Sequence, residues 1–340
     1  MKSPRLIYLI TRIHGLRMHL LKPDNIRSLV EASNLEQVVE RLLAAEYAKD
    51  IYQPHVQKLH ASEHEEIFLK KMVSRFFFVS SISPKKVKEF VLAYARRFEV
   101  ENIKRVIRAK HAGEKVGQLI PLTREQTLVN FKALLEAEDL SRVVKLLSET
   151  AYAPLAGSLP LYTEHGTTLV LESHLDKIYY EGVKLAAKKL KNKEIKHLIG
   201  VEIDTRNLLT IFAMKIRKLK PKLIEELIIQ GGTLTKRRLA PMAQAGTEEI
   251  QSFLGGTPYA KSVGDAVEAL RKKMGVDRAE AALFTPFYKE IKSMGKKSLG
   301  LPYVATYLIQ SETEAKNLIA ITMAKQLKLS ASLLRDIVLI

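Results

Sequence analysis

Residues 98–110 read Phe98-Glu-Val-Glu-Asn-Ile-Lys-Arg-Val-Ile-Arg-Ala-Lys110, and their pattern returns twice further along the chain. An acid stands three residues before an asparagine, aliphatic residues stand one and four residues after it, and a lysine stands eight residues after it. These offsets fall along one side of an α-helix, so each copy predicts a helix with a mixed polar and apolar stripe. The recurring polar residues are Glu99, Asp204 and Glu314, Asn102, Asn207 and Asn317, and Lys110, Lys215 and Lys325.

A second repeated segment precedes each of these helices. In the first copy, Ser33 and Glu36 have the spacing of a capping box, and the leucines and valines that follow share one helical face. The same face returns 105 residues later and, more faintly, a further 107 residues on, where Gln251 stands in place of a valine. Each copy ends on a tyrosine, and the three are Tyr47, Tyr152 and Tyr259.

The rest of the chain keeps a helical pattern. Periodic apolar positions predict helices over residues 63–74, 84–97 and 169–190, with breaks at Pro84, Gly113 and Gly231. The aliphatic run at 223–229 carries acids at helical spacing, and no segment alternates as a strand would. The sequence therefore predicts an all-α fold.

Three copies of one unit organise this fold. We place the helical repeats at residues 1–124, 125–230 and 231–340, with no Ser- or Pro-rich linker between them. Helical solenoids repeat every 33 to 47 residues or so, and a period of about 105 is too long for one helix pair. We therefore expect multi-helix repeats that close around a pseudo-threefold axis rather than stack in a line.

Composition limits the partners without choosing among them. The 340 residues have a formal net charge of +18 and contain no cysteine, which excludes disulfides, thiolate metal sites and a cysteine nucleophile. A basic chain of this kind favours an anionic partner, which could be nucleic acid, a lipid surface or an acidic protein face. The longest runs without formal charge, 150–163 and 298–311, are too short to span a bilayer, and the N-terminus does not resemble a signal peptide.

The basic runs all fall in the second half of the chain, and two interpretations of them stay open. They could face anionic headgroups or acidic loops of a membrane partner, or they could be solvated helix faces. The runs lie at residues 184–193, 215–222, 236–238 and 292–297.

Three features invite a catalytic interpretation, and each has a simpler one. Residues 255–262 approach a phosphate-binding loop but lack its second glycine and a preceding strand. His60 and His64 have zinc-ligand spacing without a third ligand, so we interpret them as a solvated pair. Glu172 and Asp176 lie one turn apart in an ordinary amphipathic setting. We expect no catalytic residue, no cofactor site and no metal site.

The three asparagines have a structural interpretation of their own. A polar residue on an apolar helical stripe usually satisfies backbone groups in the core. Because the acid, the asparagine and the lysine recur together, we expect a local hydrogen-bond network within each unit.

The repeated motifs as a set resemble the C subunit family of archaeal-type (A-type) and V-type rotary ATPases, which is known as the d subunit in the eukaryotic enzyme. The resemblance rests on the leucine-to-tyrosine helix ends and on the acid-x-x-asparagine helices, and it covers essentially the whole chain. The stretches that carry it are 98–110, Glu202-Ile-Asp-Thr-Arg-Asn-Leu-Leu-Thr-Ile-Phe212 and Glu312-Thr-Glu-Ala-Lys-Asn-Leu318. The third repeat departs from the pattern at Pro258 and Gln251.

The resemblance implies a funnel-shaped, non-catalytic central-stalk adaptor. Its partners would be the shaft subunits of the soluble catalytic head and the proteolipid ring in the membrane, with an anionic lipid surface as a further contact. It would act as one copy in the complex, peripheral on the cytoplasmic side, in proton or sodium transport or in ATP synthesis. The alternative is a basic helical scaffold that binds nucleic acid. That alternative explains the charge but not the repeat, and neither a stacking platform nor a base-reading motif appears, so nucleic acid is not the expected partner.

Overall fold

The computed structural model describes residues 4–44, 47, 60–297 and 300–339. Within these ranges the chain is all-α, as the sequence predicts, and contains no strand. The α-helices are α1 (Pro4–Arg17), α2 (Pro23–Glu31), α3 (Leu35–Leu43), α5 (Ala61–Ile82), α6 (Lys85–Ala112), α7 (Phe131–Glu136), α8 (Leu140–Leu147), α9 (Leu159–His165), α10 (Leu169–Leu190), α11 (Lys193–Ile216), α12 (Ile224–Leu227), α13 (Lys236–Gln244), α14 (Ala260–Arg271), α15 (Val276–Lys297), α16 (Leu301–Gln326) and α17 (Ala331–Ile337).

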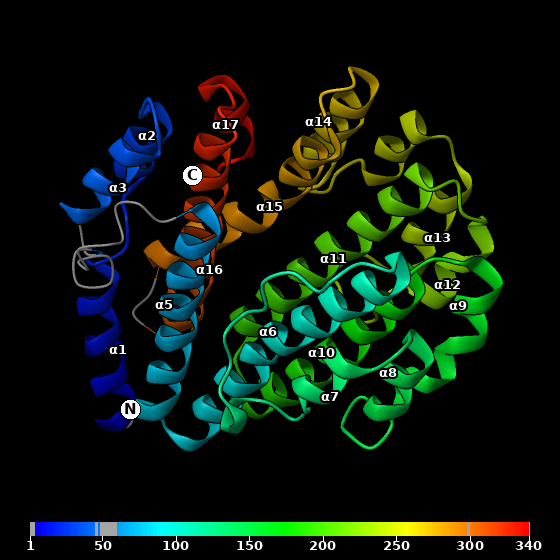
Figure 1. The fold of residues 1–340 in the computed structure, drawn as a ribbon, viewed down its shortest axis with the longest axis horizontal. Coiled ribbons are helices and arrows are strands. Elements are labelled where there is room, and N and C mark those ends of the chain that lie inside the picture. Colours follow the sequence, from blue (N-terminus) through cyan, green and yellow to red (C-terminus); the bar gives the residue numbers. More distant parts are fainter. Residues whose placement is uncertain (1–3, 45–46, 48–59, 298–299, 340) are drawn as a thin grey trace.

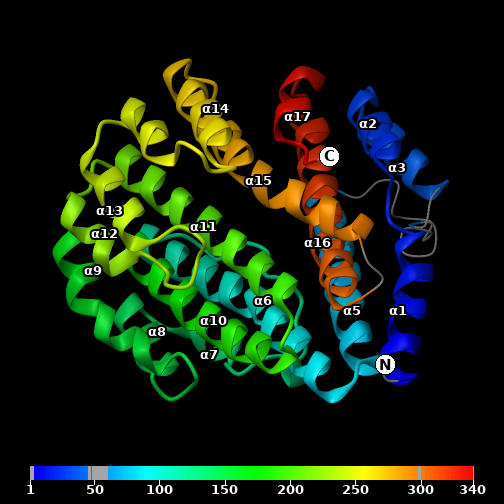
Figure 2. The ribbon, with the colours of Figure 1, turned by 180° about the vertical axis from the view of Figure 1, so that it is seen from behind.

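Six long helices form the frame, two from each sequence repeat: α5 and α6, α10 and α11, and α15 and α16. Each packs against the next in chain order, and α16 packs back against α5, so the six helices form a closed ring. Figures 1 and 2 show α5 and α16 side by side although they lie at opposite ends of the sequence. We call α6, α11 and α16 the signature helices, because they carry the repeated acid, asparagine and lysine.

The short amphipathic helices repeat with a different cap from the one the sequence suggested. The N-cap of α3 is Asn34, whose side chain accepts a hydrogen bond from the Gln37 backbone, so the capping box predicted at Ser33 is wrong. Asp139 caps α8 in the same way. Asn and Asp oxygens satisfy the free N–H groups of a helix start at least as well as Ser does.

The third repeat is less regular than the first two. Its counterpart of α3 and α8 is a 3₁₀ helix over Thr247–Leu254. At the end of the second repeat, the helix expected at 223–229 shrinks to a 3₁₀ turn followed by α12. Within the described ranges, no helix combines the length and the apolar composition needed to cross a bilayer.

The signature helices all end in the same way. The residue after each last turn has left-handed backbone, with φ of 68° at Gly113, 54° at Lys218 and 56° at Lys328. The next backbone N–H bonds back to the carbonyl five residues earlier, as at Glu114 to Ala109. This Schellman closure stops the helix and favours glycine, which only the first copy has.

Candidate functional site

The three asparagines each clamp a piece of extended backbone. The Asn102 side chain donates to the Ile120 carbonyl at 2.8 Å and accepts from the Ile120 N–H at 2.7 Å. Asn207 does the same to Ile229 at 2.9 and 2.8 Å, and Asn317 to Leu339 at 2.7 and 2.9 Å. An amide side chain has one donor and one acceptor facing the same way, which is what a single residue of extended backbone requires.

The tyrosines and acids join one repeat to another. The Tyr152 hydroxyl donates to Glu99 at 2.7 Å, and the Tyr259 hydroxyl donates to Asp204 at 2.8 Å. The third pair closes the series, because the Tyr47 hydroxyl donates to Glu314 at 2.6 Å across 267 residues of sequence. Burial raises the pKa of Tyr152 and Tyr259 well above the ordinary value, which keeps the hydroxyls protonated as donors.

The same acids also bind backbone N–H groups downstream of their helix. Asp204 accepts from the Thr233 and Leu234 backbone at 2.9 Å each, and Glu99 accepts from the backbone of residues 128 and 129. Burial raises the pKa of Asp204 above its ordinary value, although the hydrogen bonds oppose that shift. Each acid therefore fixes the start of the following repeat.

The lysines complete the connection between repeats. Lys110 donates to the carbonyls of Leu135 and Ala137 at 2.9 and 2.5 Å. Lys215 donates to Ala243 at 2.5 Å and also to Ala245. Lys325 reaches the Val30 carbonyl at 2.6 Å and so joins the last repeat to the first. We expected a hydrogen-bond network confined to each repeat, and this prediction is wrong. The acid and the lysine of one repeat bind the backbone of the next repeat.

The six long helices line a central cavity of about 490 Å³ that is open to solvent on part of its surface. Every one of them contributes to its wall, and eleven lining side chains are charged although the core around them is apolar. The charged lining residues are Glu65, Arg97, Glu101, Lys104, Arg105, Asp176, Glu202, Arg206, Glu280, Glu312 and Lys316.

A buried arginine lies in the cavity wall where three repeats meet. Arg97 donates to Glu202 at 2.7 Å, to Glu312 at 2.8 Å and to the Tyr179 hydroxyl at 2.8 Å, and it stacks on the Tyr94 ring. Burial alone would raise the pKa of Glu312, but Lys316 and Arg97 outweigh it and lower the pKa to about 2. Glu312 therefore stays ionised, and together with Glu202 it holds the arginine in place.

Further ion pairs line the wall. Lys104 donates to Asp176 at 2.6 Å, and Lys316 pairs with Glu312 at 2.7 Å. Arg206 packs over the Phe284 ring. Among the described residues, no group of three or more His, Asp or Glu side chains is placed to hold a metal ion.

Two sequence interpretations change with the structure. His60 precedes α5 and is exposed, whereas His64 is fully buried and stacks on Phe68, so the prediction of a solvated histidine pair is wrong. Helix α5 starts between the two residues, so His60 and His64 do not lie on one helical face as their spacing suggested. Asp176 lines the cavity, and Glu172 pairs with Arg108 at 2.6 Å. Neither acid is therefore an unpaired, solvated side chain of an ordinary amphipathic helix.

The sequence did not single out the charged residues of the cavity wall as a set, although their spacing in the repeats was visible. Arg97, Glu202 and Glu312 each lie five residues before a repeated asparagine. They are equivalent positions with unlike residues, and a search for identical residues passes over them.

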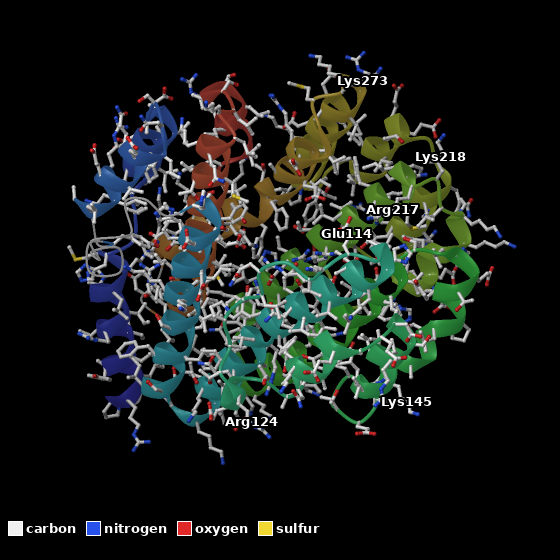
Figure 3. The ribbon with its side chains drawn as sticks, in the orientation of Figure 1. Glu114, Arg124, Lys145, Arg217, Lys218 and Lys273 are labelled. Atoms are coloured by element: carbon white, nitrogen blue, oxygen red, sulfur yellow. The ribbon has the colours of Figure 1, made fainter. Side chains whose placement is uncertain are left out.

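Basic and apolar side chains are exposed together beyond the ends of the signature helices. Ile216 and Leu327 are 44% and 65% exposed, next to Arg217 and Lys328. In Figure 3, Lys218 and Lys273 lie toward the upper edge of the molecule with Arg217 nearer the middle, and Arg124 and Lys145 lie toward the opposite edge. Part of the predicted basic run at 215–222 is therefore solvent-facing.

Comparison with known proteins gives a consistent result. Residues 9–337 match the family described as ATP synthase (C/AC39) subunit. A protein from Methanobrevibacter smithii, named as the C subunit of an A-type ATP synthase, is 30% identical over 259 residues, covering 73% of this chain and 67% of the relative. Proteins of the same name from Methanocaldococcus jannaschii and Methanosarcina mazei are 27% and 24% identical, covering 94% and 98% of this chain and 82% and 92% of the relatives.

Proposed function

The chain belongs to the ATP synthase (C/AC39) subunit family, which confirms the family resemblance of its repeated motifs, and from this membership we propose that it is a central-stalk adaptor. In this role it couples the rotating shaft of the catalytic head to the membrane proteolipid ring, for proton or sodium transport or for ATP synthesis. It contributes no catalytic residue and binds no cofactor. One copy acts in each complex, as a peripheral subunit on the cytoplasmic side of the membrane.

The observation that carries the proposal is the closed ring of six long helices around a charged cavity. A protein that transmits torque must resist twisting, and a ring without free edges does so better than an open stack of helices. Buried hydrogen bonds from a tyrosine hydroxyl to a carboxyl group reinforce the ring at each junction between repeats. The cavity gives the end of a shaft a place to enter.

We further propose that the three repeats, at residues 1–124, 125–230 and 231–340, are arranged as a pseudo-threefold funnel. The support is that tyrosine, acid, asparagine and lysine make equivalent contacts in each repeat and that the third set returns to the first. The exposed basic and apolar rim at Arg217, Lys218 and Leu327 suits an acidic protein face or anionic headgroups.

Binding measurements with a blocked cavity test the proposal. Ala320 lines the cavity, and Ala320→Arg would fill part of it. We expect the unaltered chain to bind the purified shaft subunits of the same organism's rotary ATPase in isothermal titration calorimetry. We expect Ala320→Arg to weaken that binding at least tenfold.

Ala156→Arg is the matched control, because Ala156 is exposed and does not line the cavity. It should bind the shaft as the unaltered chain does, and both variants should keep the helical circular dichroism of the parent. An unaltered chain that binds neither the shaft nor the proteolipid ring would show that the adaptor role is wrong.

A further inference from the structure

The cavity wall carries two layers of repeat-equivalent charges. The floor layer consists of Arg97, Glu202 and Glu312, which lie five residues before the repeated asparagines. The upper layer lies one helical turn further along, one residue before each asparagine, and consists of Glu101, Arg206 and Lys316. Each layer therefore has one member on each signature helix.

The floor layer is closed to an incoming partner. Its side chains are 6% to 13% exposed, and its single arginine is bonded to both of its acids. This layer has one cation and two anions where a strictly threefold protein would have three identical residues. Its charge pattern therefore distinguishes the first repeat from the other two.

The upper layer also lines the cavity, and its charge pattern is the reverse of that of the floor layer. Glu101 is 36% exposed and pairs with Arg108 at 3.2 Å, and Lys316 is 50% exposed and pairs with Glu312 of the floor layer at 2.7 Å. Arg206 packs over the Phe284 ring, and the nearby carboxylates of Asp176 and Glu202 attract its guanidinium. One anion and two cations thus face the cavity, with the anion on the same repeat as the floor arginine.

Three similar walls with like charges would offer a shaft three equal rotational settings. Unlike charges remove that equality, because a charged group on the shaft is attracted by one wall and repelled by another. The attraction is strengthened inside a cavity, where water screens charges less than it does at an open surface.

We infer that the upper layer fixes one rotational setting of the shaft end, which presents acidic side chains to Arg206 and Lys316 and a basic side chain to Glu101. This inference rests on the proposed adaptor function and adds to it the residues that choose among three settings. The specificity comes from the difference between the repeats, which their common fold does not supply.

Fluorescence distances from the rim test the inference. The natural chain has no cysteine, so a single cysteine at Ala112, Arg217 or Leu327 gives a unique label on each signature helix, ten residues after its asparagine. An acceptor dye is placed on one shaft subunit, outside the cavity. For the unaltered chain we expect three unequal donor–acceptor distances, each with one narrow distribution.

Two sets of substitutions then alter the upper layer. Glu101→Gln with Arg206→Gln and Lys316→Gln removes its charges, and the three distance distributions should broaden and converge. Glu101→Lys with Arg206→Glu and Lys316→Arg moves the charge pattern by one repeat, and the shortest distance should move to the next signature helix. In the control, Arg124→Gln with Lys132→Gln and Glu136→Gln removes the same types of charge from exposed positions and should leave the distances unchanged.

The outcomes separate this inference from the proposed function. An unaltered chain that does not bind the shaft contradicts the adaptor role itself. A chain that binds with three equal distances, or a neutral variant that keeps the original unequal distances, overturns the inference alone. If the permuted variant does not fold or bind, the neutral variant still decides the question.

Discussion

A single asparagine in each repeat satisfies both polar groups of one backbone residue. Asn207 is buried, and its two bonds to Ile229 occupy that residue's N–H and C=O. The sequence indicated a core role because a lone polar residue interrupted an apolar stripe at the same place three times. The bonded partner was not predictable, because Ile229 looks like any other aliphatic residue.

Replacing Asn207 by Leu should therefore destabilise the fold strongly. The change leaves the backbone groups of Ile229 buried without partners, which costs roughly 2–4 kcal/mol of unfolding free energy. Urea unfolding followed by circular dichroism measures this loss. Asn25→Leu is the control, since Asn25 is exposed on α2 and accepts only the solvent-facing Lys22 N–H, and the change should cost no more than about 1 kcal/mol. A Tm of Asn207→Leu equal to that of the parent would show that the clamp does not stabilise the protein.

Glu312 should make the protein less stable as the pH falls into the acid range. Its pKa falls from an ordinary value of 4.5 to about 2 in the folded chain, because Lys316 and Arg97 outweigh the effect of burial. A lowered folded pKa contributes stability above pH 4.5 that is lost as the pH falls toward 2, amounting to about 3 kcal/mol. Between these pH values, Glu312→Gln should lose less unfolding free energy than the parent does. Parallel pH profiles for the two proteins would contradict this assignment.

The ends of the signature helices were only partly predictable from the sequence. The sequence marked a break at Gly113 but not at Lys218 or Lys328, because lysine is not a usual signal for left-handed backbone. All three helices end at the same distance after the repeated asparagine, and the Schellman closure forms even where the residue type is unfavourable. Similarly, Thr247–Leu254 keeps the apolar positions of its counterparts yet winds as a 3₁₀ helix.

Exchanging lysine for glycine at one such end should stabilise the protein. A non-glycine residue in left-handed backbone costs about 1–2 kcal/mol, and part of that is recovered when glycine replaces it. We expect Lys218→Gly to raise the free energy of unfolding by about 1 kcal/mol. Gly113→Ala should lower it by a similar amount, since no atom lies within 4 Å of the added methyl group and only the backbone is strained. Changes of the opposite sign in thermal melts would refute the argument.

Closure of the ring is a property of the whole molecule that no local pattern could predict. The pairs Tyr152 with Glu99 and Tyr259 with Asp204 span 53 and 55 residues, but the pair Tyr47 with Glu314 spans 267. The repeat identified all six residues, and only the structure placed the third tyrosine against the last acid. The cavity charges were not predicted for a related reason: they stand at equivalent positions of the three repeats but differ in residue type, so they do not appear as a repeated motif.

The closing pair should contribute as much stability as an internal one. Tyr152→Phe and Tyr47→Phe each remove one hydroxyl from a buried carboxylate that keeps an arginine partner, Arg96 or Arg75. Each variant should lose about 2 kcal/mol of unfolding free energy. Denaturant titrations in which only Tyr152→Phe is destabilised would show that the ring is not held closed at Tyr47.

The most direct test of the adaptor role is ion transport by a rotary ATPase assembled with and without this chain. The membrane complex is reconstituted in vesicles, and ATP hydrolysis and ion uptake are measured together. Without the chain, we expect hydrolysis by the catalytic head to continue while ion uptake stops, and we expect added chain to restore uptake. Ion uptake that proceeds at the same rate in its absence would contradict the proposed coupling.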